Sequence, residues 1–183
     1  MKKHRFGLLK RFLSNLHIYV LWLLISVLFW GWIFGFVTDA RPEKKVTLFV
    51  SAETIEDAAL AAALQSALPE GLRLVKVHPI GYAFFQTQEL ESADLYVLRE
   101  SELEADVGFF RPLPLDPGEA AWSKDGTVWA LRCYDAAAGR GAADSYIDYR
   151  AGGEDCYLCF GARSVHAEDA AAEAVARRFL ELE

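Results

Sequence analysis

The chain has 183 residues, of which 53% are hydrophobic, and its formal net charge is −7. This length accommodates one domain and a membrane segment but not two full-sized domains. No acidic residue precedes Asp39, so the rest of the chain carries all 26 acidic residues against 14 Lys and Arg residues, a net charge of −12. Such a domain repels nucleic acid and anionic lipid headgroups, so neither is an expected partner.

The segment 18–37 contains no charged residue and is almost uniformly apolar, with aromatic residues towards both of its ends. As a helix it spans about 30 Å, the thickness of the hydrocarbon core of a bilayer, so we expect it to cross the membrane. A secretory signal peptide is the alternative, because 38–40 loosely fits a cleavage pattern. The apolar run is nevertheless longer and more aromatic than is usual for such peptides.

Residues 1–17 form a basic leader whose apolar residues recur at helical spacing, which favours an amphipathic segment on the inner leaflet or a continuation of the membrane helix. Five basic residues precede the span, against three that follow it closely. The positive-inside rule therefore places the N-terminus in the cytoplasm and the domain outside, in a single-pass cell-membrane protein. Residues 38–45 read as a short polar linker.

Residues 46–183 predict one α/β domain. A strand at 45–50 precedes an alanine-rich helix, for which Thr54 is the expected N-cap and Pro69 and Gly71 mark the end. Further strands are expected at 72–77, 93–98, 127–133 and 155–160, with a turn at Asp125-Gly126 and a final helix over 168–182. Because strands alternate with helical segments in the first half, we expect a mainly parallel sheet of about five strands.

Three stretches are notable in this order: the strand and following helix at 93–103 with 108–113, the strand at 125–131, and the last strand and helix at 157–164 and 176–180. Together they resemble the extracellular solute-binding proteins of bacterial ABC importers. The resemblance implies a solute-binding fold. However, only about twenty residues, 134–154, separate the last two strands, which leaves no room for a second lobe. The resemblance therefore implies a one-lobed relative without clamshell closure.

The chain has three cysteines, Cys133, Cys156 and Cys159. A zinc site would need further ligands that no second CxxC or HxxxH motif supplies. On a strand, residues three apart point to opposite faces, which separates Cys156 from Cys159. Three buried thiols, or one disulfide between Cys133 and either of the other two, remain the alternatives.

Two histidines of the domain, His78 and His166, each follow a valine near a strand end, where parallel sheets place ligand crevices. Aromatic and arginine side chains, which are favoured at interfaces, suggest further contact residues. The candidate ligand-binding residues are His78, Tyr82, Arg132, Tyr134 and His166. Capping or core packing is the alternative for each.

No motif predicts a hydrolase elbow, a phosphate loop or a metal site, so we expect neither an enzyme nor a cofactor. The sequence favours a membrane-anchored recognition domain, held in the bilayer through 18–37, that contacts a membrane complex or an extracytoplasmic protein. A small-solute sensor or accessory component of a transport system is the alternative. A concave pocket with converging polar groups would favour that alternative.

Overall fold

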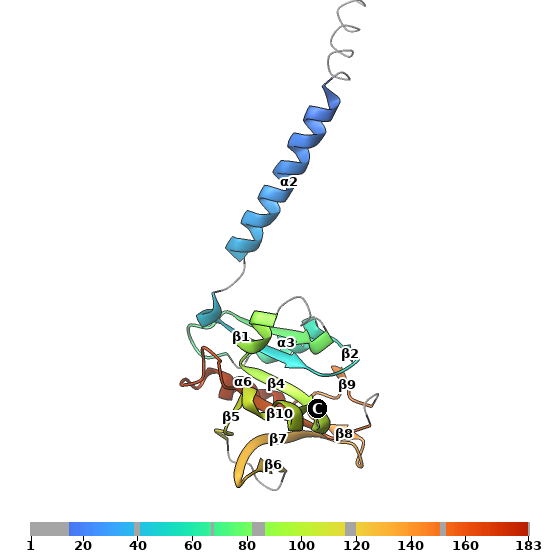
Figure 1. Ribbon diagram of the computed structural model, residues 1–183, viewed down its shortest axis with the longest axis vertical. Coiled ribbons are helices and arrows are strands. Elements are labelled where there is room, and N and C mark those ends of the chain that lie inside the picture. Colours follow the sequence, from blue (N-terminus) through green and yellow to red (C-terminus); the bar gives the residue numbers. More distant parts are fainter. Residues whose placement is uncertain are drawn as a thin grey trace, which may run out of the picture. The chain divides into compact units, whose positions relative to one another are not determined.

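The computed structural model describes residues 15–38, 41–66, 68–81, 87–115, 120–150 and 153–182 (Figure 1). The chain divides into two units, Met1–Ala40 and Arg41–Glu183. The first fourteen residues of the basic leader and the candidate residue Tyr82 lie outside the described residues.

The first unit contains α2 (Leu16–Thr38), a helix of 23 residues with no acidic residue in its first turn and no basic residue in its last. Its segment Leu16–Ile33 is the one stretch, among the described residues, that is long and apolar enough to cross a membrane. Its composition is mostly apolar, so few side chains compete for the backbone hydrogen bonds of the helix. A signal sequence near the N-terminus would satisfy the same criteria of length and composition.

The second unit is a mixed α/β domain. Its helical elements are η1 (Pro42–Lys44), α3 (Asp57–Gln65), α4 (Thr87–Glu91), α5 (Glu100–Asp106), η3 (Val107–Phe109) and α6 (Ala171–Leu180). Its strands are β1 (Lys45–Val50), β2 (Thr54–Ile55), β3 (Leu74–Pro79), β4 (Leu95–Arg99), β5 (Phe110–Arg111), β6 (Ala121–Lys124), β7 (Thr127–Asp135), β8 (Arg140–Gly141), β9 (Ile147–Asp148) and β10 (Cys156–Gly161).

The main sheet is mixed and has eight strands, which corrects the expected five-stranded and mainly parallel sheet. Its central order is β3-β1-β4-β10-β7-β6, with β5 beside β10 and β8 beside β7. Among the described residues, only the pairs β1–β3 and β1–β4 are parallel. The pairs β4–β10, β10–β7 and β7–β6 are antiparallel. The helical crossovers that parallel pairing requires occur only in the first half of the domain, and later strands are joined by turns and loops.

Side chains of the central strands alternate between two cores on opposite faces of the sheet, as the two-residue period of a strand requires. One core contains Leu48, Val97 and Leu158 with the buried faces of α3 and α6. The other contains Phe49, Tyr96 and Tyr157 with Leu103 of α5. Both faces of β1, β4 and β10 are therefore buried, which explains their almost continuous apolar sequences.

Two local expectations have different outcomes. Thr54 is not a helix cap but belongs to the short strand β2, which pairs with β9, and α3 begins only after Glu56. Asp125 and Gly126 do form the hairpin turn between β6 and β7, with φ values of 54° and 78°. Positive φ at both positions is the geometry that Asp-Gly favours in a two-residue hairpin.

Candidate functional site

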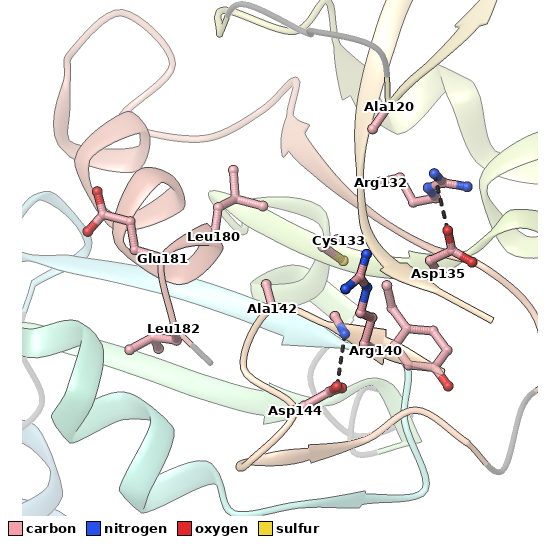
Figure 2. Close-up of a pocket in the computed structure, with 12 residues that line it drawn as sticks. Ala120, Arg132, Cys133, Asp135, Arg140, Ala142, Asp144, Leu180, Glu181 and Leu182 are labelled. Carbon is pink, nitrogen blue, oxygen red and sulfur yellow. Dashed lines mark hydrogen bonds and ion pairs between the residues drawn. The ribbon is translucent and has the colours of Figure 1, made fainter. Parts of the chain in front are cut away.

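A depression of about 760 Å³ lies between the end of β7, strand β8 and the last residues of the chain after α6. Its lining includes two of the predicted contact residues, Arg132 and Tyr134, with Arg140, Asp144 and Leu182 (Figure 2). Charged side chains, backbone groups and a few apolar side chains share the wall. This is the candidate functional site.

The wall of this pocket is built by a tight return of the chain after β7. Asp135 begins the return, since its backbone carbonyl accepts a hydrogen bond from Gly139 N at 2.8 Å and its side chain accepts one from Ala138 N at 2.9 Å. Strand β8 then pairs back onto the end of β7. A β-carbon at Gly141 would lie 2.5 Å from the carbonyl oxygen of Cys133, so this close approach requires glycine.

The first arginine of the site, Arg132, is held by two carboxylates. Its guanidinium lies 3.1 Å from Asp155 Oδ2 and 3.3 Å from Asp135 Oδ2. The hydrogen bond to Asp155 and the charge of Asp135 raise the pKa of Arg132. The hydrogen bond from Ala138 N and the charge of Arg132 lower the pKa of Asp135, against the effect of partial desolvation. Arg132 therefore orders the end of β7, and its charge is already neutralised.

The second arginine, Arg140, lies at the same pocket without such partners. Its guanidinium makes no hydrogen bond or ion pair with any of the residues that the structure describes. Asp144 accepts a hydrogen bond from Gly141 N at 2.8 Å through one carboxylate oxygen (Figure 2). The pocket thus presents a positive and a negative side chain that do not neutralise one another.

The other sequence candidates lie elsewhere. Tyr134 is 4% exposed and stacks on Tyr149 with ring centroids 4.7 Å apart, so most of its ring belongs to the core. His78 lies opposite Phe49 in the β1–β3 register, with ring centroids 5.4 Å apart. Burial lowers the pKa of His78, and its Nε2 has no hydrogen-bond partner among the described residues.

The structure does not bring His78 and His166 together. His166 follows β10, which runs antiparallel to β4, and its ring meets the first residue of β1. His78 lies beside the other end of β1, opposite Phe49. The two histidines therefore do not share a crevice at the carboxyl ends of the parallel strands. Because β10 runs antiparallel to β4, the chain after β10 places His166 at the amino ends of β1 and β4.

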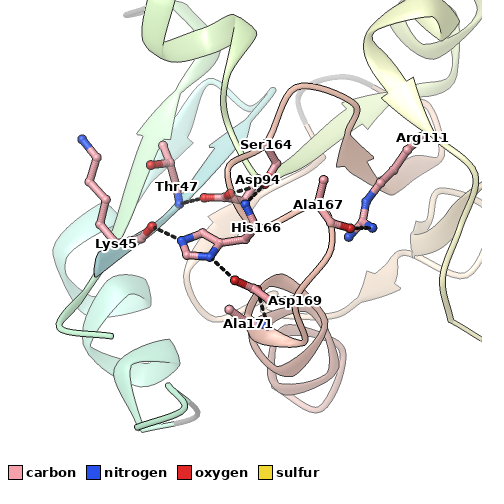
Figure 3. A network of polar contacts seen from close by, with 9 residues as sticks. All are labelled: Lys45, Thr47, Asp94, Arg111, Ser164, His166, Ala167, Asp169 and Ala171. Carbon is pink, nitrogen blue, oxygen red and sulfur yellow. Dashed lines mark hydrogen bonds and ion pairs between the residues drawn. The ribbon is translucent and has the colours of Figure 1, made fainter. Parts of the chain in front are cut away.

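His166 instead belongs to a polar network that the sequence did not reveal (Figure 3). Its Nδ1 lies 2.6 Å from Asp169 Oδ2 and its Nε2 lies 3.1 Å from the carbonyl oxygen of Lys45. Nearby, Ser164 donates a hydrogen bond to the buried carboxylate of Asp94, whose other oxygen accepts one from Thr47 N at 2.7 Å. No short-range pattern predicts the contacts with Lys45, Asp94 and Thr47, since they join segments far apart in the sequence.

Ser164, His166 and Asp169 have the residue types of a hydrolase triad but not its geometry. The ring nitrogens of His166 face a carboxylate and a backbone carbonyl, and the hydroxyl of Ser164 is bonded to Asp94 and to the backbone nitrogen of His166. A triad requires the imidazole to accept the proton of the nucleophile. The arrangement is that of a structural network.

All three cysteines are free and buried, so neither of the two candidate disulfides is formed. Cys133 and Cys156 face one core, and Cys159 faces the other, as expected from their spacing. Burial raises the pKa of Cys156 to about 12 and raises the pKa values of Cys133 and Cys159 above the ordinary value as well. These thiols therefore stay protonated near neutral pH.

Within the described ranges, no three His, Cys, Asp or Glu residues are arranged to hold a metal ion. No protein-family model matches the chain, and no curated protein matches it with significant similarity.

Proposed function

We propose that this protein is a membrane-anchored recognition domain without catalytic activity, which binds an extracytoplasmic protein or membrane complex through the pocket beside β7. The observation that carries this proposal is the guanidinium of Arg140 at the pocket, which makes no hydrogen bond or ion pair with a described residue. Its neighbour Arg132, by contrast, is paired with Asp135 and Asp155. The pocket is open to solvent and bordered by charged groups, which suits a side chain on a partner surface better than a fully enclosed solute.

Anchoring and orientation belong to the same proposal. Helix α2 spans the bilayer, the basic leader stays in the cytoplasm and the domain lies outside. Proteolysis of sealed membrane vesicles of known orientation tests this arrangement. A protease added to vesicles with the outer membrane face exposed should remove the domain and leave α2 in the membrane. Release of the intact domain by alkaline washing would instead indicate a cleaved signal sequence.

The recognition surface is tested with a photo-cross-linking amino acid at Ala137, which is exposed on the return beside the pocket. Lys124, in β6 before the hairpin turn, is the control position. We expect a discrete cross-linked protein from position 137 and not from position 124. Arg140→Gln should abolish the product, whereas Arg73→Gln, which removes another exposed arginine, should leave it intact. A product that survives Arg140→Gln would overturn the proposed surface.

A small-solute sensor is the second candidate, and the size of the pocket favours it. A volume of about 760 Å³ falls within the usual range of small-molecule sites. Arg140 and Asp144 carry opposite charges, so the matching solute has both a carboxylate and an ammonium group. This candidate retains the one-lobed relation to solute-binding proteins as part of the proposal.

Thermal unfolding of the full chain in nanodiscs with a panel of amino acids and short peptides tests the solute candidate. A ligand at about 100 times its Kd should raise Tm by about 5–10 °C. Asp144→Asn should remove the shift, whereas Asp125→Asn, in the distant hairpin turn, should not. A flat response from a cooperatively unfolding sample would exclude these solutes and leave the protein partner.

A further inference from the structure

The imidazole of His166 is enclosed by hydrogen-bond acceptors. The residue is 3% exposed. Its Nδ1 lies 2.6 Å from Asp169 Oδ2, and its Nε2 lies 3.1 Å from the carbonyl oxygen of Lys45 (Figure 3). A carboxylate and a backbone carbonyl only accept hydrogen bonds. Both ring nitrogens must therefore carry a proton if both contacts are to be hydrogen bonds, and only the imidazolium cation has two N–H groups.

Charged residues from β1, β5 and the segments before β4 and α6 surround the imidazole of His166. Asp169 precedes α6, and Asp94 precedes β4; both attract the imidazolium. Lys45 of β1 presents its carbonyl, while its ammonium group is paired with Glu89 of α4 at 2.8 Å. Arg111 of β5 donates to the carbonyl of Ala167, and its guanidinium lies 5.2 Å from the ring centre of Phe160. The two carboxylates favour the charged form of His166.

Residues of this cluster form hydrogen bonds at the beginnings of β1, β4 and α6. His166 holds Lys45, the first residue of β1. Asp94, directly before β4, accepts from Thr47 N at 2.7 Å. Asp169 accepts a hydrogen bond at 2.9 Å from the backbone nitrogen of Ala171, the first residue of α6. Lys45 is also the last residue of the linker 38–45. His166 therefore contacts the residue at which the chain passes from the linker into β1.

We propose that His166 is a proton-controlled latch, which holds the first residue of β1 against the loop 162–170 when it is protonated and releases it when the proton is lost. Asp169, as the charged acceptor, keeps the one remaining proton on Nδ1. The lone pair of Nε2 then faces the lone pairs of the Lys45 carbonyl, and the contact changes from attractive to repulsive. The loop stays connected to α6 through Asp169, while the start of β1 loses its side-chain support.

The direction of the pKa shift agrees with this mechanism. Burial acts to lower the pKa of His166, but the hydrogen bond to Asp169, the charges of Asp94 and Asp169 and the bond to Lys45 outweigh it, so that the pKa is raised. The latch is therefore closed below the ordinary histidine pKa and opens as the pH rises through the raised pKa of His166. This inference does not depend on the ligand proposed for the pocket.

The latch is tested on the full chain in nanodiscs labelled with ¹³C-histidine. His166 should titrate above the ordinary value of about 6.5. Over the same pH range, hydrogen exchange at the amides of Thr47 and Arg73, corrected for intrinsic rates, should speed up at least tenfold. Both amides donate to groups at the start of β1 or beside it: Thr47 N to Asp94, and Arg73 N to the carbonyl of Lys44. Amides of β6, which lies beyond β10 and β7 from β1 and β4, should not respond.

Two variants make the test specific. Asp169→Asn keeps an acceptor near Nδ1 but removes the charge, so the opening should move to lower pH by about one unit or more. His78→Gln removes the signal of the other histidine of the domain and so identifies that of His166. This variant should leave the pH at which exchange speeds up unchanged. A pKa of His166 at or below 6.5 would overturn the proposal. So would a normal titration without faster exchange at Thr47 and Arg73.

Discussion

Arg132 on β7 and Asp155 directly before β10 are joined by an ion pair in which Nη1 and Oδ2 lie 3.1 Å apart. The other oxygen of Asp155 accepts a hydrogen bond from Ala136 N at 2.8 Å, at the point where the chain leaves β7. One carboxylate therefore fixes both a side chain and a backbone amide at the edge of the candidate pocket. The position of Arg140, a few residues further along, depends on this anchor.

Replacing Asp155 should consequently loosen the pocket wall. Asp155→Ala leaves the amide of Ala136 without its acceptor, which should lower the free energy of unfolding by about 1–2 kcal/mol. Arg132→Gln should have a smaller effect, since the side chain is 38% exposed and solvent weakens its ion pairs. Urea denaturation of the two variants in detergent measures the difference. An Asp155→Ala variant no less stable than Arg132→Gln would contradict this ranking.

A second prediction concerns Gly161 at the end of β10. A β-carbon at this position would collide with the carbonyl oxygen of Ala93, in the segment that leads into β4. Gly161→Ala should therefore force the two strands apart and lower the free energy of unfolding by about 2–3 kcal/mol. Gly108→Ala is the matched control, because nothing lies within 4 Å of the β-carbon it would add. Equal denaturation midpoints for the two variants would count against the close strand contact.

The sequence predicts the central strands well and the sheet poorly, for physical reasons. Strands β1, β4 and β10 are buried on both faces, so their apolar runs are local signals. Strand direction is not encoded locally. The antiparallel addition of β10 next to β4 follows from the connections between strands, and the short strands β5, β8 and β9 have too few residues to show a period.

At the candidate site, too, the sequence predicts local arrangements but not long-range contacts. Arg132 and Tyr134 are two residues apart on one strand, so their joint presence near the pocket is a local property. The contacts of His166 with Lys45 and of Ser164 with Asp94 join residues separated by 121 and 70 positions, respectively. Such contacts depend on strand order, which the sequence pattern did not provide. A histidine beside a strand end therefore does not by itself indicate a ligand crevice.

A third prediction follows from the burial of the cysteines. Because burial raises the pKa values of Cys133, Cys156 and Cys159, their reactive thiolate forms are scarce at pH 8. A thiol-specific chromogenic reagent should find almost no reactive group in the folded chain. The same reagent should find all three cysteines after denaturation without reductant. Only one reactive thiol after denaturation would instead show that a disulfide forms.

The last prediction is a maximum of stability near the ordinary histidine pKa of about 6.5, produced by two histidines with opposite shifts. The pKa of His166 is raised, so its contribution is complete below about 6.5 and is lost as the pH rises through the folded-state pKa. The pKa of His78 is lowered by burial, so the fold favours its neutral form. Its contribution is complete above about 6.5 and is lost as the pH falls through the folded-state pKa.

Denaturant unfolding between pH 5.5 and 8 separates these two effects. His166→Gln should flatten the decline on the alkaline side, and His78→Gln should flatten the decline on the acidic side. Each variant serves as the control for the other, since the two rings lie at opposite ends of β1. A His166→Gln variant that keeps the full alkaline decline would show that another group causes it. The buried thiols do not account for such a decline, because an unperturbed cysteine titrates only near pH 8.5.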